Sequence, residues 1–195
     1  FRPGPRASVL DAAVTALLQR VAAFPPDVIG MTLFSENARA AYDLRLAAAA
    51  ASRAARAALF VAGGPHATAV PREPLAHGFG AVVAGEGDHA LPALLAHPAR
   101  DIPGVYRHPT APPAEARARV ADLAALPSST DSLSLSAPGD YGPHGRLSVG
   151  GVLLQRGCPG RCTFCATLVT GKVVRVRPPA AVLAELRWLW VNDGI

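Results

Sequence analysis

Three closely spaced cysteines are the residues of this 195-residue chain best suited to chemistry. Cys158, Cys162 and Cys165 are its only cysteines and lie in the segment RGCPGRCTFCA. An odd number confined to one loop cannot form a disulfide framework across a fold, which favours metal or redox chemistry. Thiolates select soft metals, and a compact run of them on one loop suits a [4Fe–4S] cluster. Three protein ligands would leave one iron open, as a catalytic metal site requires.

The alternative is a zinc site with a histidine as the fourth ligand. His144 is the nearest candidate and lies fourteen residues before Cys158. Structural zinc sites usually consist of two paired knuckles, and the sequence has no second pair. We therefore predict iron–sulfur rather than zinc.

Basic residues lie on both sides of the cysteines. Arg156 and Arg161 either favour the more negative reduced cluster or are simply solvated. Lys172, Arg175 and Arg177 follow the loop and could reach a phosphate or carboxylate, but solvated side chains are the favoured interpretation.

The overall charge does not indicate a nucleic-acid partner, although it is +5 at pH 7. The arginines are scattered along Ala-rich segments, and no basic run is interleaved with aromatic residues. No apolar run is long enough for a membrane helix, and no signal peptide is visible. These features predict a cytoplasmic protein without a membrane or nucleic-acid partner.

The N-terminal half alternates predicted strands and helices. Apolar runs at residues 27–34, 58–63 and 80–84 have the length of strands buried on both faces. Before the first run we expect a helix opened by a Ser8–Asp11 capping box, and after it a helix that is capped by Ser35 and runs to about Arg56. After the second run we expect a loop over residues 64–71 and a short helix around Leu75. A last helix is expected over residues 89–97. This alternation predicts an α/β fold with a Rossmann-like parallel sheet, whose strands all end at one edge, where ligands bind.

The C-terminal half is predicted to continue this pattern after a linker. Residues 108–145 are rich in Pro, Ala and Ser, with one helical piece at residues 114–126. A strand over residues 147–154, the cysteine loop and a helix that starts at residues 178–179 would form one further strand–loop–helix unit.

The cysteine segment resembles the radical S-adenosylmethionine (SAM) superfamily in its C-x3-C-x2-C spacing and in Phe164 before the last cysteine. The resemblance implies that the three cysteines hold three irons, that SAM chelates the fourth and that Phe164 lies near the adenine. It implies reductive cleavage of SAM to a 5′-deoxyadenosyl radical that abstracts a hydrogen. The expected partners are a small-molecule substrate and a low-potential electron donor such as flavodoxin or ferredoxin.

The first 100 residues resemble the cobalamin (B12)-binding domain that precedes many radical SAM domains. The similar segments are PDVIGMTLFSENARAAYDL, VAGGPHAT and VVAGEGDHALPALL, followed by IPGVYR and DLAALPS. The resemblance implies that the corrin edge is lined by Thr32, Ser35, Glu36, Gly63, Gly64, His66 and Thr68. It also implies that Gly85, Glu86 and Gly87 approach the nucleotide tail. The D-x-H-x-x-G motif of a lower axial histidine is absent, so His66 is either a corrin contact or a satisfied loop histidine.

The predicted organisation is a B12-binding-type domain over residues 1–107, a linker over residues 108–145 and the start of a partial (β/α) radical SAM barrel over residues 146–195. The family's further barrel units do not follow, so we interpret the chain as a fragment. The predicted function is reductive SAM cleavage with cobalamin as second cofactor, for methyl transfer or another radical transformation. One alternative is a corrinoid-binding or carrier module without catalysis. Another is a methylthiotransferase-like enzyme, which the absence of cysteines from residues 1–157 disfavours.

Overall fold

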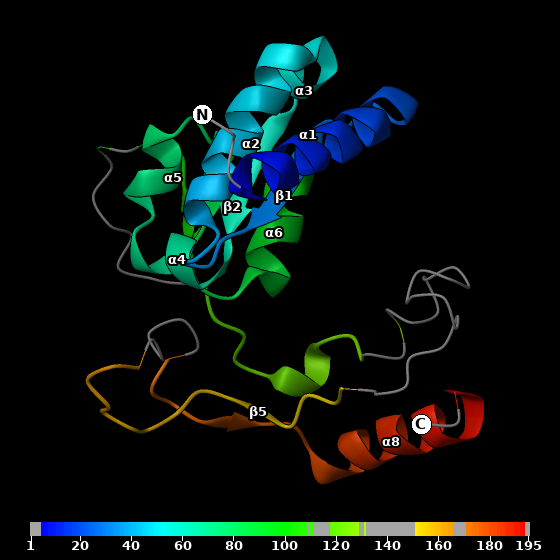
Figure 1. The fold of residues 1–195 in the computed structure, drawn as a ribbon. Helices are drawn as coiled ribbons and strands as arrows, with labels where there is room; N and C mark the ends of the chain where they lie inside the picture. Colours follow the sequence, from blue (N-terminus) through cyan, green and yellow to red (C-terminus); the bar gives the residue numbers. More distant parts are fainter. Residues whose placement is uncertain are drawn as a thin grey trace. The chain divides into compact units, whose positions relative to one another are not determined.

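The chain folds into two compact units, Phe1–Arg119 and Val120–Ile195, here called the N-terminal and C-terminal units. A computed structural model describes residues 5–108, 110, 118–128, 131, 151–165 and 171–193, with side chains omitted for residues 5–10 and 192–193. Figure 1 shows the ribbon of each unit. His144 and residues 147–150 lie outside the described residues, and the predicted domain boundaries stay a prediction.

A four-stranded sheet forms the centre of the N-terminal unit. In order across the sheet, its strands are β1 (Val28–Thr32), β2 (Leu59–Gly63), β3 (Ala81–Val83) and β4 (Val105–Tyr106). The first three are parallel, with Val28 opposite Leu59 and Val61 opposite Ala81, and β4 runs antiparallel to β3. The predicted parallel α/β sheet is confirmed. The sequence did not predict β4, because a two-residue strand is too short for a periodic signal.

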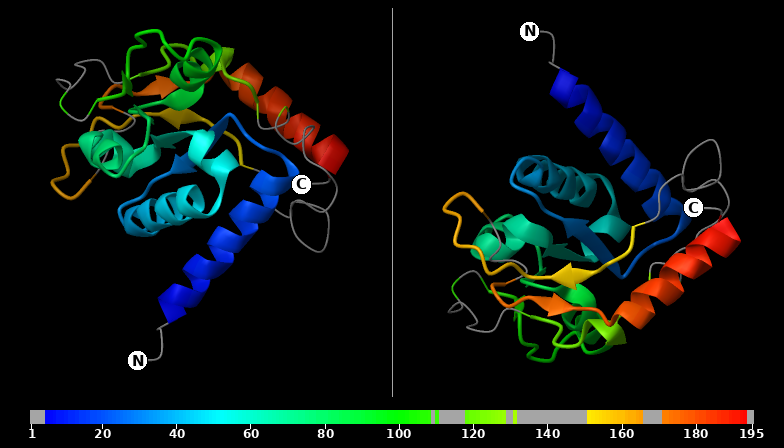
Figure 2. Two further views of the ribbon diagram at one scale, coloured as in Figure 1. Left: turned by 90° about the horizontal axis from the view of Figure 1, so that it is seen from above. Right: turned by 90° about the horizontal axis from the view of Figure 1, so that it is seen from below.

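Helices cover both faces of this sheet (Figures 1 and 2). The described helices of the unit are α1 (Pro5–Ala23), α2 (Ala38–Ala51), α3 (Arg53–Ala57), α4 (Gly64–Ala69), α5 (Arg72–Ala76) and α6 (Gly87–Ala96). Phe60 and Val82 point into the core with α1 to α5, whereas Val61 and Val83 pack with Ala90 and Leu94 of α6. Successive strand residues alternate between faces, which accounts for this division.

Alanine dominates the larger of the two cores. Seven of the sixteen buried residues in the described cluster are alanines, namely Ala38, Ala48, Ala55, Ala58, Ala62, Ala67 and Ala84. Larger side chains are contributed by Val21 of α1, Tyr42 of α2 and Phe60 of β2. The α1–α5 face is therefore packed through close approach of backbones as well as through bulky side chains.

Several predicted helix boundaries were wrong. α1 begins at Pro5 rather than at Ser8, because proline is preorganised for the first helical turn and lacks the N–H that would be unsatisfied there. The single helix predicted from Ser35 to Arg56 is two helices, because the Ser52 hydroxyl accepts a hydrogen bond from the Ala55 N–H at 3.2 Å and caps α3. Ser35 caps no helix: α2 starts after Asn37.

Two further expectations for this unit also differ from the structure. The predicted loop over residues 64–71 contains α4, whose first turn holds Pro65. β1 was expected to be buried on both faces, but Gly30 and Thr32 are exposed. Only Val28 of β1 packs against the α6 cluster, so α6 leaves most of that face of β1 uncovered.

The C-terminal unit contains a two-stranded sheet and a long helix. β5 (Gln155–Arg156) pairs antiparallel with β6 (Arg175–Val176), and α8 (Pro179–Asp193) follows at the predicted start. The strand predicted over residues 147–154 is wrong in its described part, because residues 151–154 precede β5 without strand structure. The described part of the helix predicted over residues 114–126 contains only a 3-10 turn, η1 (Leu123–Ala125).

Part of the predicted linker packs in a small core of this unit. Val120, Leu123 and Leu126 are buried and contact Leu153. The Asp122 carboxylate accepts a hydrogen bond from the Ala124 N–H at 2.8 Å, which caps η1 locally instead of starting a longer helix. No helix in the described parts of the chain is long and apolar enough to cross a membrane.

Candidate functional site

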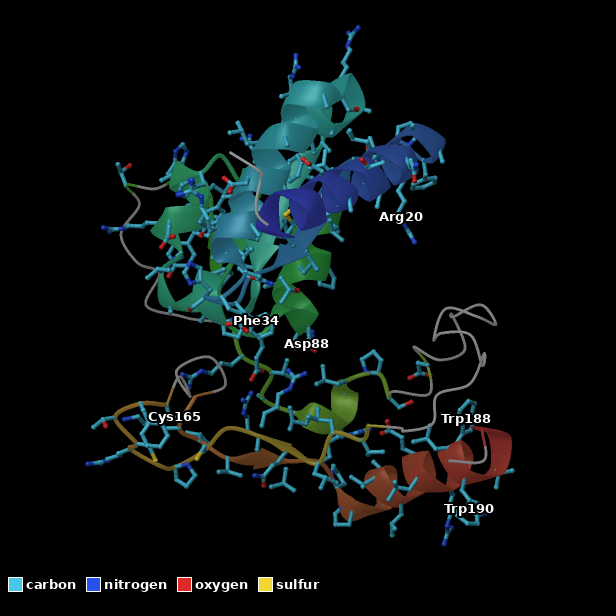
Figure 3. The ribbon with its side chains drawn as sticks, viewed as in Figure 1. Arg20, Phe34, Asp88, Cys165, Trp188 and Trp190 are labelled. Atoms are coloured by element: carbon cyan, nitrogen blue, oxygen red, sulfur yellow. The ribbon has the colours of Figure 1, made fainter. Side chains whose placement is uncertain are left out.

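The loops that follow β1, β2 and β3 gather at one end of the N-terminal unit. Phe34 after β1 and Asp88 at the start of α6 mark this end in Figure 3. The Leu33 N–H donates to the Gly63 carbonyl at 2.8 Å, and the His66 N–H donates to the Leu33 carbonyl at 3.0 Å. The end of β1 is thus tied to both the end of β2 and the start of α4. We call this region the sheet edge.

Gly64 is required where the backbones of the sheet edge meet. Its φ is +93°, and a Cβ there would lie 2.8 Å from the Leu33 carbonyl oxygen and 2.9 Å from Thr32 Cγ2. A Cβ on Gly63 would meet only the Val83 carbonyl oxygen, at 3.8 Å. Thr32, Gly63 and Gly64, which were predicted to line one site, therefore lie close together. Gly64 must be a glycine because a side chain would clash with the end of β1.

Thr68 links α4 to the loop after β3. Its buried hydroxyl donates to the Gly64 carbonyl at 2.8 Å and accepts from the Gly85 N–H at 2.9 Å. Gly85 has a φ of +98°, which glycine adopts without strain. Thr68 was predicted to line a corrin site, and in the structure its hydroxyl holds two backbone segments together.

His66 lies in a hydrogen-bonded cluster with three other side chains. Its Nδ1 is 3.2 Å from Ser35 Oγ, and its Nε2 is 3.2 Å from the Tyr42 hydroxyl and 3.5 Å from Glu73 Oε2. Both ring nitrogens of His66 are therefore engaged, which supports the interpretation of a satisfied loop histidine. Glu36, also predicted to line the edge, is exposed.

The Gly85–Glu86–Gly87 segment pairs with Ala118, which lies within the helical piece predicted over residues 114–126. The Glu86 N–H donates to the Ala118 carbonyl at 2.8 Å, and Ala118 forms a parallel bridge with Gly85. Gly104, at a φ of +82°, leaves space for Ala118, because a Cβ there would lie 2.7 Å from the Ala118 nitrogen. Glu86 is buried, and Gly87 begins α6.

Sequence reasoning missed several residues of the sheet edge. Phe34 offers an aromatic ring that is 44 % exposed, directly after Leu33. The Asn37 side-chain oxygen accepts a hydrogen bond from the Phe34 N–H at 2.8 Å and closes this turn. The S-x-N pattern after an apolar strand was the available signal for the turn. Tyr42 and Glu73 gave no signal, because they reach His66 only through the fold.

The cysteine loop of the C-terminal unit is closed at its base by β5 and β6. The Cys158 N–H donates to the Gly171 carbonyl at 3.1 Å, and the Cys165 N–H donates to the Cys162 carbonyl at 3.2 Å. Gly157, at a φ of +94°, packs so closely against the Val173 carbonyl that no side chain fits. The loop itself is open: all three cysteines are exposed and unpaired, and Phe164 is 90 % exposed.

Two of the three thiols lie beside Gly160. A Cβ at Gly160 would lie 3.3 Å from Cys158 Sγ and 3.7 Å from Cys162 Sγ. Within the described ranges, no three His, Cys, Asp or Glu side chains are gathered closely enough to hold a metal ion. The structure therefore places the Cys158 and Cys162 sulfurs beside the same glycine. Three thiolate donors on one exposed loop fit an iron–sulfur cluster.

Two basic residues beyond the loop are not solvated, contrary to our expectation. The Arg177 guanidinium is buried and lies 2.5 Å from the Glu185 carboxylate of α8, and the Arg177 backbone N–H donates to the Leu154 carbonyl at 2.9 Å. The Arg175 guanidinium donates to the Val120 carbonyl. A buried guanidinium needs such a partner, so both residues are engaged within the unit. Lys172 is exposed, as predicted. Of the two arginines for which both interpretations were left open, Arg161 is exposed and Arg156 is half-buried.

Comparison with known proteins agrees with the fold of the N-terminal unit. The family model of the B12-binding domain matches residues 4–95. The parallel sheet with helices on both faces is the Rossmann-like fold of this domain class. The N-terminal unit is thus a B12-binding-type Rossmann-like domain.

Two solved structures of one enzyme are similar to the chain. Both are of the radical S-adenosylmethionine methyltransferase TsrM from Kitasatospora setae, one with tryptophan substrate and the SAM analog aza-SAM bound, the other with cobalamin and a [4Fe–4S] cluster bound. Their sequence identities to this chain are 19 % and 17 %, with TM-scores of 0.58 and 0.55. Each match covers 90 % of this chain, which spans only 37 % of the TsrM chain. The similarity shows the fold alone. No sequence among curated proteins matches this chain.

Proposed function

We propose that the chain is part of a radical SAM enzyme that carries cobalamin on the N-terminal unit and a [4Fe–4S] cluster on Cys158, Cys162 and Cys165. The observation that carries this proposal is the position of the Cys158 and Cys162 sulfurs beside Gly160 in a C-x3-C-x2-C loop. The match of residues 4–95 to the B12-binding domain supports cobalamin as the second cofactor. The similar TsrM structure contains both cofactors.

The residues of this chain would hold the cofactors in defined ways. When bound, the cluster with SAM supplies one-electron bond cleavage, and cobalamin supplies a carrier for a methyl group. The Cys158 N–H bonds to the Gly171 carbonyl, and the buried Arg177–Glu185 pair holds the segment that follows the loop. The thiolates therefore extend from a backbone that is held in place. Phe164, which is exposed at the tip, would cover the adenine of SAM.

The proposed reaction is methyl transfer to, or another radical transformation of, a small molecule. Electrons would come from flavodoxin or ferredoxin in the cytoplasm, where thiols stay reduced. This assignment extends the cysteine chemistry and the fold similarity to the whole protein.

Anaerobic iron–sulfur reconstitution with added hydroxocobalamin tests the proposal. We expect about four irons per chain and corrin absorbance that survives desalting. Single replacement of Cys158, Cys162 or Cys165 by Ala should abolish the iron signal, whereas Thr163→Ala in the same loop should keep it. Zinc in place of iron, or iron that persists in all three cysteine variants, would contradict the cluster assignment.

A corrinoid-binding module without catalysis is the second candidate. It is favoured by the exposure of all three cysteines and by the match of the B12-binding domain model to residues 4–95 alone. Corrin retained without iron after reconstitution would select this function over the enzyme.

A further inference from the structure

We propose that Tyr42 and Glu73 are positioning residues for cobalamin binding: they fix the tautomer of His66, which in turn holds the Ser35 hydroxyl at the sheet edge. The inference rests on the proposed cobalamin function and extends it to two residues that lie away from the edge. All four side chains belong to the N-terminal unit and form a chain of contacts from Glu73 to Ser35.

The proton position in this cluster is determined by Glu73. Its Oε2 lies 3.5 Å from His66 Nε2, and a carboxylate only accepts hydrogen bonds, so it favours a proton on that nitrogen. With Nε2 protonated, the Tyr42 oxygen, 3.2 Å away, accepts from it.

The position of that proton determines what His66 offers to Ser35. In a neutral imidazole one nitrogen carries the proton and the other accepts. With Nε2 protonated, Nδ1 accepts from the Ser35 hydroxyl over the observed 3.2 Å. Ser35 is therefore anchored as a donor to His66, and its oxygen keeps an acceptor site at the edge. Without this contact, the exposed turn after β1 would lose its side-chain link to α4.

The ring of Tyr42 is held rigidly, which makes it a suitable anchor. It stacks on His77 with 4.1 Å between ring centroids and meets Phe79 edge-on at 6.1 Å. Burial and the Glu73 carboxylate raise the pKa of Tyr42 to about 12, so the phenol stays protonated in the physiological range. The Tyr42 hydroxyl beside His66 Nε2 is thus fixed in place and in charge.

Nitrogen-15 NMR of the histidine rings in the cofactor-free 195-residue chain tests the tautomer directly. Six histidines contribute signals, and the His66→Gln variant identifies the one that matters. In its neutral form, we expect His66 to have a protonated Nε2 and a bare Nδ1. In the double variant Tyr42→Phe/Glu73→Gln both tautomers should be populated. A wild-type His66 with its proton on Nδ1 would overturn the proposal, whatever the chain binds.

Hydroxocobalamin titration then tests the consequence for the ligand. The double variant should bind about three- to tenfold more weakly than wild type, as expected for the loss of one hydrogen-bonded anchor. The matched control is Tyr106→Phe/Asp43→Asn, which removes the same groups from a buried tyrosine of β4 and a carboxylate of α2. This control should bind like wild type.

The two proposals fail differently. Wild-type affinity in a folded Tyr42→Phe/Glu73→Gln variant would overturn the positioning role and leave the cobalamin function intact. A wild-type chain that retains no corrin would overturn both. An equal loss in the Tyr106→Phe/Asp43→Asn control would also overturn the positioning role, because the effect would then be general destabilisation.

Discussion

The hydroxyl of Thr68 accepts a hydrogen bond from the Gly85 N–H at 2.9 Å and thereby joins α4 to the end of β3. Thr68→Val keeps the shape of the side chain but leaves the Gly85 N–H without its acceptor. Because a buried polar group without a partner costs about 1–3 kcal/mol, we expect the free energy of unfolding to fall by that amount. Urea denaturation followed by circular dichroism measures it. Thr15→Val on the exposed side of α1 is the control and should change stability by less than about 0.5 kcal/mol.

Gly64→Ala should destabilise the N-terminal unit and disturb the sheet edge. The new Cβ would lie 2.8 Å from the Leu33 carbonyl oxygen, at a φ of +93° that L residues rarely adopt. We expect a loss of about 2 kcal/mol or more in the free energy of unfolding. Gly30→Ala serves as the control, because nothing lies within 4 Å of a Cβ there. Equal stability of the two variants would show that the backbone at Gly64 relaxes without cost.

Glu185→Ala should selectively destabilise the C-terminal unit. It leaves the Arg177 guanidinium buried without its carboxylate partner, which costs about 3–5 kcal/mol. Both tryptophans of the chain, Trp188 and Trp190, lie on α8, so their fluorescence reports on this unit during denaturation (Figure 3). The comparison is Asp43→Ala, which breaks the exposed Arg39–Asp43 pair and should cost about 0.5 kcal/mol or less.

Tyr42 should make the stability of the N-terminal unit fall at alkaline pH. Its pKa is raised from 10.0 to about 12 by burial and by Glu73, so above pH 10 the unfolded chain loses the phenolic proton while the folded chain keeps it. The stabilisation is complete below pH 10 and is lost as the pH rises towards 12, by at most about 1.4 kcal/mol per pH unit. Denaturation at pH 9 and pH 11.5 should show this fall in wild type and in Tyr106→Phe. In Tyr42→Phe the fall should be smaller by the contribution of that one group.

Gly160→Ala should reduce cluster loading without unfolding the loop. The methyl group would lie 3.3 Å from Cys158 Sγ and 3.7 Å from Cys162 Sγ, where it would hinder the approach of a cluster to both sulfurs. We expect the iron content after reconstitution to drop several-fold, with the same free-thiol count. Gly151→Ala, where a Cβ meets nothing within 4 Å, should load like wild type. Full loading of Gly160→Ala would show that the cluster does not approach the sulfurs from this side.

The sequence predicted those parts of the fold that depend on runs of one residue type. β2 and β3 are short apolar runs between turn residues, and such runs form buried strands in most contexts. β5 and β6 were not predicted, because a strand pair of two residues each is determined by the partner and not by its own sequence. α4 was expected to be a loop because its Gly, Pro, His and Thr residues are poor helix formers, yet it packs against β2 and β3.

The candidate site shows the same division between local and distant causes. The cysteine motif was recognisable because its three ligands lie on one short segment. That the Cys158 and Cys162 sulfurs both lie beside Gly160 depends on the geometry of the loop, which the spacing of the cysteines alone does not determine. Ser35 was expected to cap a helix, but its hydroxyl contacts His66, 31 residues along the chain. A side chain with both a local and a distant option cannot be assigned from local sequence.

The alanine-rich core of the N-terminal unit has a consequence for its response to temperature. Alanine has no rotamers to lose on folding, and it removes less hydrocarbon surface from water than valine or leucine would. The heat capacity change of unfolding scales with that surface. The stability of this unit should therefore vary along a shallow curve between cold and heat, with a modest maximum and a wide working range.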